Sequence, residues 1–460
     1  MLKRYIGDRA FYRRIFAIAI PIIIQNGITN FVSLLDNIMV GSIGTAQMSG
    51  VSIANQLLFV FNLCVFGACS GAGIFTAQFH GSKDDTGVRH TFRFKMIASF
   101  FLAVVGCSLF LTAGKSLIGM YLTGDGDPLE AAKTLSFGIR YLKVMLIGLI
   151  PFAITNCYSS TLRESGQTVV PMVAGIVAVF VNLCGNVILI FGYLGAPALG
   201  VVGAALATVL SRFVEMGIVV VWTHCHGNEH PFIREVYSSL YIPGKLCLDI
   251  FRKGMPLLVN EFLWSSGMAI LNQCYSTCGL DVVPAANISG ALFNLGSVAF
   301  LALGNSVGIL MGQMLGAGRS ETEVRDTNRK LLTLSVSSGV IFGALVASVS
   351  GVFPMLYDTE PSVRHLATQL VLVNAIMMPF SAFTNATYFT LRSGGQTTVT
   401  FLFDSCFTWC VCVPLAFCLS RFTNLPILPL YAICQSLEFI KALLGGWMLK
   451  RGKWIQNLTV

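Results

Sequence analysis

The chain has 460 residues, of which 55% are hydrophobic and only 11% are charged, with a mean hydropathy of +0.74. Soluble domains carry about 25% charged residues, so this composition excludes an ordinary soluble globular protein. The net charge of +9 comes from Lys and Arg in the short segments between long apolar stretches, which indicates membrane topology rather than nucleic-acid binding.

The apolar stretches predict an all-α polytopic membrane protein with about twelve transmembrane helices, because each is close to or longer than the roughly 20 residues that cross a bilayer. In the first half we expect spans near 15–40, 50–79, 92–113, 137–161, 168–191 and 199–222. In the second half we expect them near 254–279, 285–315, 330–352, 366–390, 398–420 and 426–448.

The longest polar connection divides these spans into two sets of six. We therefore predict an N-terminal lobe at 1–222, a cytoplasmic linker at 223–253, and a C-terminal lobe with a short basic tail at 254–460. Basic residues are concentrated in alternate connections, which predicts a multi-pass protein of the plasma (inner) membrane with both termini in the cytoplasm. The basic N-terminus runs directly into a full span, so we expect no cleavable signal peptide.

The two halves repeat one another. The segment NCYSSTLRESGQTVV at 156–170 matches NATYFTLRSGGQTTV at 385–399 with a spacing of 229. Earlier matches, such as Pro21 with Pro256 and Gln78 with Gln313, have a spacing of 235. Because each half has an even number of spans, we expect the lobes to be related by a pseudo-two-fold axis along the membrane normal, with the working site between them.

Acidic residues inside spans carry the most functional information, since a carboxylate at the bilayer centre costs about 2.5–3.5 kcal/mol on insertion scales. Asp36 lies in the first span, on the same helical face as Gln25, Thr29 and Ser33. This face predicts a protonatable or cation-binding site that lines a central cavity. The alternative is a hydrated structural acid near the outer end of the helix.

A second acid, Glu261, lies in the seventh span with Ser265 and Asn272 on its face, and with Asn260 and Trp264 on the adjoining stripe. A carboxylate beside an indole ring suits a lipophilic cation, through charge and cation–π contact. The alternative for Trp264 is packing in the core or against lipid.

Asp404 in the eleventh span is a third candidate for cation or proton coupling. Its alternative is a helix-start acid stabilised by the helix dipole. The pairs Arg212 with Glu215 and Glu438 with Lys441 are three residues apart, and we expect each pair to neutralise itself.

Asparagines recur near the span centres, and Asn55, Asn182 and Asn287 are predicted to line the cavity. Interhelical hydrogen bonds would also explain them. The sequence lacks HExxH, GxSxG and P-loop motifs, so we expect neither catalytic residues nor an enzyme. The histidines and cysteine at 224–226, together with His230, resemble a metal cluster, but a solvated loop is the preferred interpretation; we expect no metal site and no cofactor beyond the coupling ion.

Three sets of motifs resemble the multidrug and toxic compound extrusion (MATE) family. They are the opening PIIIQNGITNFVSLLDNIMVGSIG, the pair GAGIFTAQFHGSKD and SVGILMGQMLGAGRSE, and the pair TLRESGQT and TLRSGGQT. The resemblance covers nearly the whole chain. It suggests a bacterial protein, closer to the DinF-like, Firmicute-type branch than to NorM.

The resemblance implies an exporter of two six-helix lobes. Such proteins exchange small organic cations or amphiphiles for H⁺ or Na⁺ by alternating access, and we expect this one to act as a monomer in the lipid bilayer. Asp36 matches the first-span acid linked to coupling in the DinF-like branch, and Glu261 resembles the seventh-span acid of the NorM-like branch. The eighth and tenth spans carry Asn287 and Asn374 and no acid, whereas the NorM-like branch has a carboxylate in both, which favours H⁺. The alternative function is a flippase for a lipid-linked or amphiphilic precursor.

Overall fold

The computed structural model describes residues 5–122, 128–279, 281–357 and 359–459. The side chains of residues 33, 34, 37, 38 and 194 also lie outside the described part. Within it the regular structure is helical, and the predicted all-α polytopic fold is confirmed.

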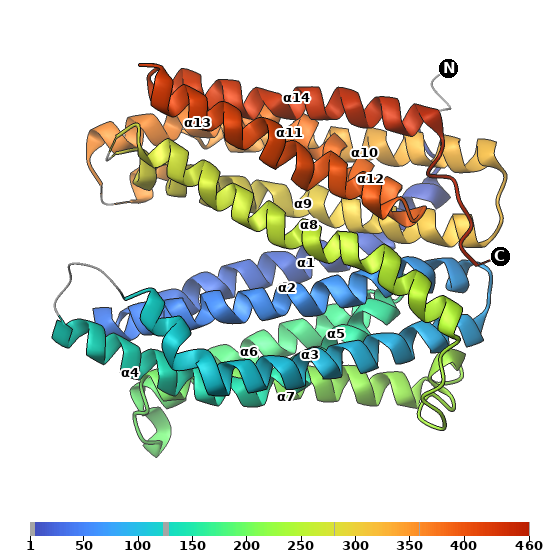
Figure 1. Ribbon diagram of the computed structural model, residues 1–460, viewed down its shortest axis with the longest axis horizontal. Helices are drawn as coiled ribbons and strands as arrows, with labels where there is room; N and C mark the ends of the chain where they lie inside the picture. Colours follow the sequence, from blue (N-terminus) through green and yellow to red (C-terminus); the bar gives the residue numbers. More distant parts are fainter. Residues whose placement is uncertain (1–4, 123–127, 280, 358, 460) are drawn as a thin grey trace. The chain divides into compact units, whose positions relative to one another are not determined.

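Figure 1 shows long helices joined by short connections. The first half contains α1 (Arg9–Gly41), α2 (Thr45–Gly81), α3 (Asp85–Met120), α4 (Pro128–Met145), the short η2 (Leu146–Gly148), α5 (Leu149–Glu164), α6 (Val169–Phe191), η3 (Tyr193–Gly195) and α7 (Val201–Cys225). A turn of 3₁₀-helix, η4 (Pro231–Ile233), lies in the connection that follows.

The second half contains α8 (Gly244–Ser276), α9 (Val282–Gly316), α10 (Glu321–Ser348), η5 (Phe353–Leu356), α11 (Pro361–Ser393), α12 (Thr397–Phe401), η6 (Leu402–Cys406), η7 (Thr408–Cys412), α13 (Val413–Phe422) and α14 (Ile427–Arg451). The segment from α12 to α13 is one continuous span in which η6 and η7 have π-helical hydrogen bonding. Wider turns of this kind inside an α-helix are frequent at functional sites.

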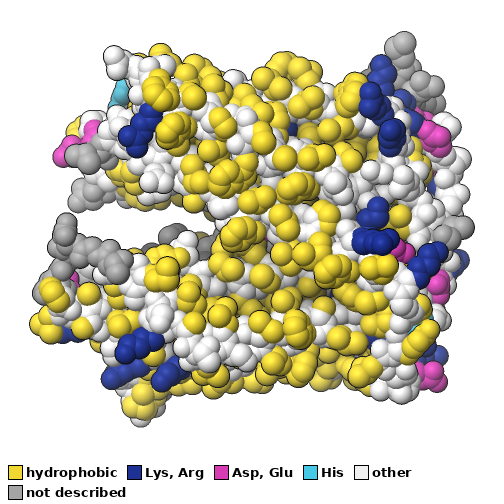
Figure 2. All heavy atoms as spheres, viewed as in Figure 1, with side chains coloured by type: hydrophobic (Ala, Val, Ile, Leu, Met, Phe, Trp, Pro, Cys, Tyr) yellow, Lys and Arg dark blue, Asp and Glu magenta, His cyan; other side chains and the backbone are white. Residues whose placement is uncertain are grey.

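Eleven segments of the described chain are long and apolar enough to cross a membrane. Helix α8 has 33 residues and is also long enough, but Lys245, Asp249 and Arg252 make its first turns polar. In Figure 2 the Lys and Arg side chains gather toward the ends of the helices, and hydrophobic side chains cover the surface between them. This distribution is the one expected of membrane-spanning helices.

The chain divides into two compact units that interleave in sequence. Unit 1 consists of Met1–Ile23, Ala77–Lys83 and Arg252–Val460, and unit 2 consists of Ile24–Thr76 and Asp84–Phe251. The division therefore falls inside α1, α2 and α8 and in the turn between α2 and α3. The lobes predicted at 1–222 and 254–460 are defined by the sequence repeat and not by contacts between residues, and they stay a prediction.

Unit 1 has a core to which the first turns of α1 contribute. Ile15, Ile18 and Ile22 of α1 are buried in one cluster with Leu303 and Leu310 of α9. Burying a large aliphatic side chain stabilises a fold by about 1.5–3 kcal/mol, although inside a membrane close packing replaces much of this hydrophobic gain. These α1 residues consequently fix the start of the helix to the second half of the sequence.

The repeat-matched glycines Gly81 and Gly316 lie where the ends of α2 and α9 cross in unit 1. A Cβ atom on Gly81 would overlap the carbonyl of Gln313, and one on Gly316 would overlap the carbonyl of Gln78. Small residues let two helix backbones approach this closely. This repeat pair thus serves helix packing.

Candidate functional site

The carboxylate of Asp36 in α1 is hydrogen-bonded to two asparagines that lie one turn apart on α6. Asn186 donates from Nδ2 to Asp36 Oδ1 at 2.7 Å. The amide of Asn182, turned so that its nitrogen faces acceptors, donates to Oδ1 at 3.0 Å and to Oδ2 at 2.9 Å, while its oxygen lies 3.1 Å from the Thr208 hydroxyl of α7. Hydrogen bonds to a charged acceptor are about twice as strong as neutral ones.

The hydrogen-bonded group extends from Asp36 to α2 and α4. Tyr141 of α4 donates from its hydroxyl to Asn55 Oδ1 of α2 at 3.1 Å, and the same ring lies beside Thr208. Unit 2 therefore gathers polar side chains from α1, α2, α4, α6 and α7 around one carboxylate. Of the residues predicted to line the cavity, the structure brings Asn182 into contact with Asp36 and places Asn55 in the same network.

The other polar residues of the α1 face have different surroundings. Gln25 Oε1 accepts a 2.9 Å hydrogen bond from Arg163 Nη2, at the end of α5 in the duplicated turn. Thr29 is exposed, and the side chain of Ser33 lies outside the described part of the chain. The Arg163 guanidinium therefore links the end of α5 to α1 within unit 2.

Unit 1 contains a second polar group around Asp404, which lies in η6. Lys441 of α14 donates to Asp404 Oδ1 at 2.6 Å, and Asn260 of α8 donates to Asp404 Oδ2 at 3.1 Å. Ser405 donates to Asn260 Oδ1 at 2.7 Å. The expected Glu438–Lys441 pair is corrected here: Lys441 forms its ion pair with Asp404, and Glu438 instead accepts from Thr384 at 3.0 Å.

Glu261 is partly buried in α8 and lies within electrostatic reach of Arg392 and Asp404. Ser265, one turn further along α8, is also partly buried. The remaining predicted cavity residues of unit 1, namely Trp264, Asn272 and Asn287, have exposed side chains.

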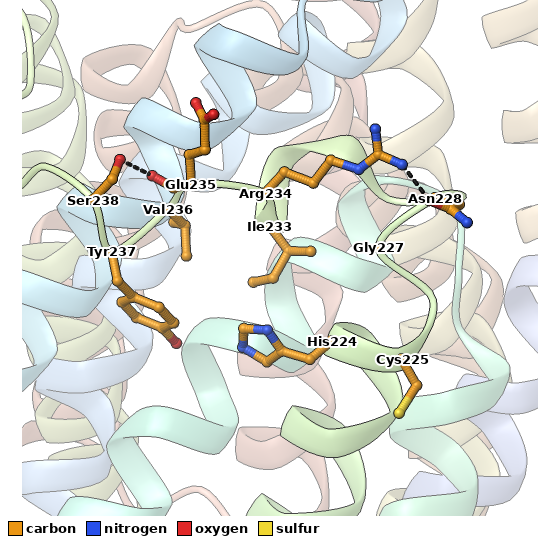
Figure 3. A pocket seen from close by; sticks show the side chains of 10 residues that line it. All are labelled: His224, Cys225, Gly227, Asn228, Ile233, Arg234, Glu235, Val236, Tyr237 and Ser238. Atoms are coloured by element: carbon orange, nitrogen blue, oxygen red, sulfur yellow. Dashed lines mark hydrogen bonds between the residues drawn. The ribbon is translucent and has the colours of Figure 1, made fainter.

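The end of α7 and the histidine-rich connection that follows line an open pocket of about 480 Å³. Figure 3 shows ten residues around it, with the His224 ring lying near the Tyr237 ring. The Tyr158 hydroxyl contacts both Tyr237 Oη and, at 3.1 Å, His224 Nε2. Across the described residues, His, Cys, Asp and Glu do not gather in threes as a metal site would need.

Two arginines of α3 hold this connection against their own helix within unit 2, a role that sequence reasoning missed. Arg93 donates to the carbonyls of Glu235 and Val236, both at 2.8 Å, and Arg89 donates to the carbonyl of Phe232 at 3.3 Å. The sequence showed these arginines only as cytoplasmic charge. Their four-residue spacing, which puts both on one helix face, was the available signal.

The family model MatE matches residues 21–188 and 256–418, which together make up well over half of the chain. The chain belongs to the MATE family. The two matched segments lie in the two halves of the repeat, and both begin at the repeat-matched prolines. Members of this family are transporters rather than enzymes, so the prediction that the chain is not an enzyme is confirmed.

Relatives of this MATE protein match over most of its length. It is 25% identical over 445 residues to the probable multidrug resistance protein NorM of Thermotoga maritima, and the alignment covers 96% of this chain and 93% of that protein. It is 23% identical over 425 residues to the probable multidrug resistance protein YoeA of Bacillus subtilis, and the alignment covers 91% of this chain and 89% of that protein.

Solved structures show the same fold. A crystal structure of MATE in complex with MaL6 aligns with a TM-score of 0.85 at 19% identity and covers 99% of this chain and 98% of that one. An outward-facing conformation of a multidrug resistance MATE family transporter of the MOP superfamily aligns with a TM-score of 0.84 at 19% identity, with 98% of both chains covered. These similarities establish the two-lobe MATE fold for this chain.

Proposed function

We propose that this MATE protein is a secondary active transporter that exports small cationic or amphiphilic organic compounds in exchange for H⁺, by alternating access. The hydrogen-bonded carboxylate of Asp36 in unit 2 carries the proposal. A relative named as a probable multidrug resistance protein supports the class of substrate.

The surroundings of Asp36 suit a carboxylate that gains and loses a proton. The ionised acid accepts from Asn186 and from the turned amide of Asn182. In the opposite orientation the Asn182 nitrogen donates to Thr208 at 3.1 Å, and its oxygen lies 3.3 Å from Asn186 Nδ2 and faces Asp36. A protonated Asp36 can donate to that oxygen. The same side chains therefore satisfy both protonation states, one for each orientation of Asn182.

One proton is sufficient for useful export. A single charge moving through 100 mV releases about 2.3 kcal/mol, which sustains roughly a 50-fold concentration ratio. Because Asn186 and the turned amide of Asn182 donate to both oxygens of the ionised carboxylate, we propose H⁺ rather than Na⁺ as the coupling ion.

The experiment is ethidium export from proteoliposomes driven by an imposed pH gradient, with Asp36→Asn as the test variant. We expect the variant to lose gradient-driven export and to retain ethidium exchange at equal pH, because exchange needs binding and reorientation but no coupling. Asp8→Asn, at an exposed acid that caps Phe11 near the start of α1, is the control. Unchanged gradient-driven export in Asp36→Asn would rule out the assignment.

We further propose a monomer in the plasma membrane with both termini in the cytoplasm, and lobes at 1–222 and 254–460 joined by the 223–253 linker. The flippase alternative is less favoured. A lipid-linked phosphate needs free cationic groups, whereas the buried Lys95 and Lys441 are each paired with an acid.

A further inference from the structure

The ion pair between Lys441 and Asp404 lies inside the membrane-spanning part of unit 1. The Lys441 side chain is 10% exposed and the Asp404 side chain 17%. The ammonium also lies 5.4 Å from the centre of the Phe403 ring. Asn260, which is 1% exposed, donates to the other oxygen of Asp404. Three segments, α8, η6 and α14, thus supply the side chains around this pair.

Stability alone does not explain the pair. Removing two charges from water costs several kcal/mol per ion, and a well-packed apolar pair of similar volume is often at least as stable. Ionisable residues inside a membrane are therefore read first as functional.

The group has an excess of acid. Asp404 and Glu438 both act on Lys441 through their charges, and Glu261 adds a third carboxylate within electrostatic reach of Arg392 and Asp404. Without the lysine, Asp404 and Glu438 would share a region with the hydroxyls of Ser405 and Thr384 and the amide of Asn260. Carboxylate, hydroxyl and amide oxygens are the ligands that hard cations bind. The ammonium of Lys441 stands in this region as a permanent internal cation.

We propose that Lys441 is a specificity-determining residue for the coupling ion: its ammonium replaces a monovalent metal cation at Asp404 and keeps Na⁺ out of unit 1. The proposal rests on the proposed function, because it concerns which ion drives transport. It assigns the proton to Asp36 in unit 2 and leaves the acids of unit 1 with a built-in counter-ion.

The test measures the thermal unfolding midpoint of the full-length protein in detergent, with NaCl compared with choline chloride at equal ionic strength. A ligand that binds only the folded state raises this midpoint. We expect wild type and Lys441→Arg to have equal midpoints in the two salts. Lys441→Met should gain a saturable rise in NaCl, and the double variant Lys441→Met/Asp404→Asn should lose that rise.

Two results would overturn the proposal. The first is that Lys441→Met elutes as folded protein but has the same unfolding midpoint in NaCl and in choline chloride. The second is that NaCl raises the unfolding midpoint of the wild type and that Asp404→Asn abolishes this rise. This second comparison can be made even if Lys441→Met does not fold. The readout needs no transport, so its result is independent of the Asp36→Asn export experiment.

Discussion

Asn186 in α6 donates a 2.7 Å hydrogen bond to the carboxylate of Asp36 in α1, two residues separated by 150 positions in the sequence. The bond joins α1 to α6 within unit 2. Asn182 lies one turn earlier on α6 and reaches both oxygens of the same carboxylate. The two asparagines together control how the charge on Asp36 is stabilised.

Replacing Asn182 with Leu should reduce gradient-driven ethidium export by about 10- to 150-fold. The loss of a hydrogen bond to a charged group costs about 1.5–3 kcal/mol, which corresponds to that range. The measurement is the initial export rate in proteoliposomes. Asn305→Leu is the control, because the hydrogen bond that Asn305 donates stays within its own helix, to the carbonyl of Leu301 at 3.2 Å. Equal losses in both variants would show a general effect of removing a membrane asparagine.

The sequence singles out Asp36 because an acid in an apolar span stands out, whereas Gln25 and Thr29 on the same helical face lie outside the network around it. The partners on other helices could be predicted only in part. Asn182 was a candidate, whereas Thr208 and Tyr141 are residue types that packed helices use widely. The rotation of α6 and α7 about their axes, which decides their contacts, depends on packing and not on local spacing.

The Lys441 partner shows the limit of spacing rules more clearly. Glu438 is three residues away on the same helix, and the i,i+3 rule favours it. Asp404 on a different helix forms the ion pair instead, at 2.6 Å. The π-helical turns of η6 and η7 change which face of the eleventh span points toward α14, and the apolar pattern of 398–420 gives no sign of them. The fold was predictable because the apolar stretches of the sequence directly give the length and number of the membrane-spanning helices.

Glu164→Gln should destabilise the protein strongly, by about 3–5 kcal/mol, because it leaves a buried charge unpaired. The Lys95 side chain is 0% exposed, and its ammonium pairs with Glu164 and donates to Thr161 at 3.0 Å. The double variant Lys95→Met/Glu164→Leu should recover most of the loss, since it removes both charges. Chemical unfolding in detergent gives the comparison.

The control for that experiment is Asp326→Asn. Asp326 pairs with Arg329 at 3.0 Å, and these side chains are 34% and 45% exposed. An exposed pair contributes about 0–1 kcal/mol. If Asp326→Asn and Glu164→Gln had similar effects, burial would not be the reason for the strength of the Lys95 pair.

The connection after α7 should detach from α3 as the pH falls below about 6.5, the ordinary pKa of histidine. Burial lowers the pKa of His230, an effect that Glu229 opposes and His226 reinforces. Its ring packs against Trp222 and Phe232, at 5.5 and 6.1 Å between centroids. The detached form therefore binds the proton at a higher pH than the docked form, so docking is complete above the ordinary pKa and weakens as the pH falls.

Limited proteolysis of residues 226–243 at pH 7.5 and 5.5 tests this sign. Wild type should be cleaved faster at pH 5.5, and His230→Phe should remove most of the difference, because phenylalanine keeps the ring contacts without titrating. Faster cleavage at the higher pH would contradict the prediction.

Gln78→Leu should destabilise unit 1 more than the repeat-matched Gln313→Leu. Gln78 is 0% exposed, and its Oε1 accepts from the Leu458 backbone at 2.6 Å while its Nε2 donates to the carbonyls of Ser393 and Gln456. The substitution removes the partner of three backbone groups, of which the Ser393 carbonyl is buried and costs about 1–3 kcal/mol when unsatisfied. The difference in thermal midpoint between the two variants is the measurement.

The comparison is informative because the two glutamines occupy the same place in the repeat. Gln313 accepts from Arg14 at 3.2 Å, and that guanidinium can turn to water when the amide is lost. The Ser393 carbonyl lacks this freedom, because it lies buried beside the Gln78 amide. Gln78 therefore links the end of α2 to the C-terminal segment. A larger loss of thermal midpoint in Gln313→Leu than in Gln78→Leu would contradict the claim that these contacts stabilise unit 1.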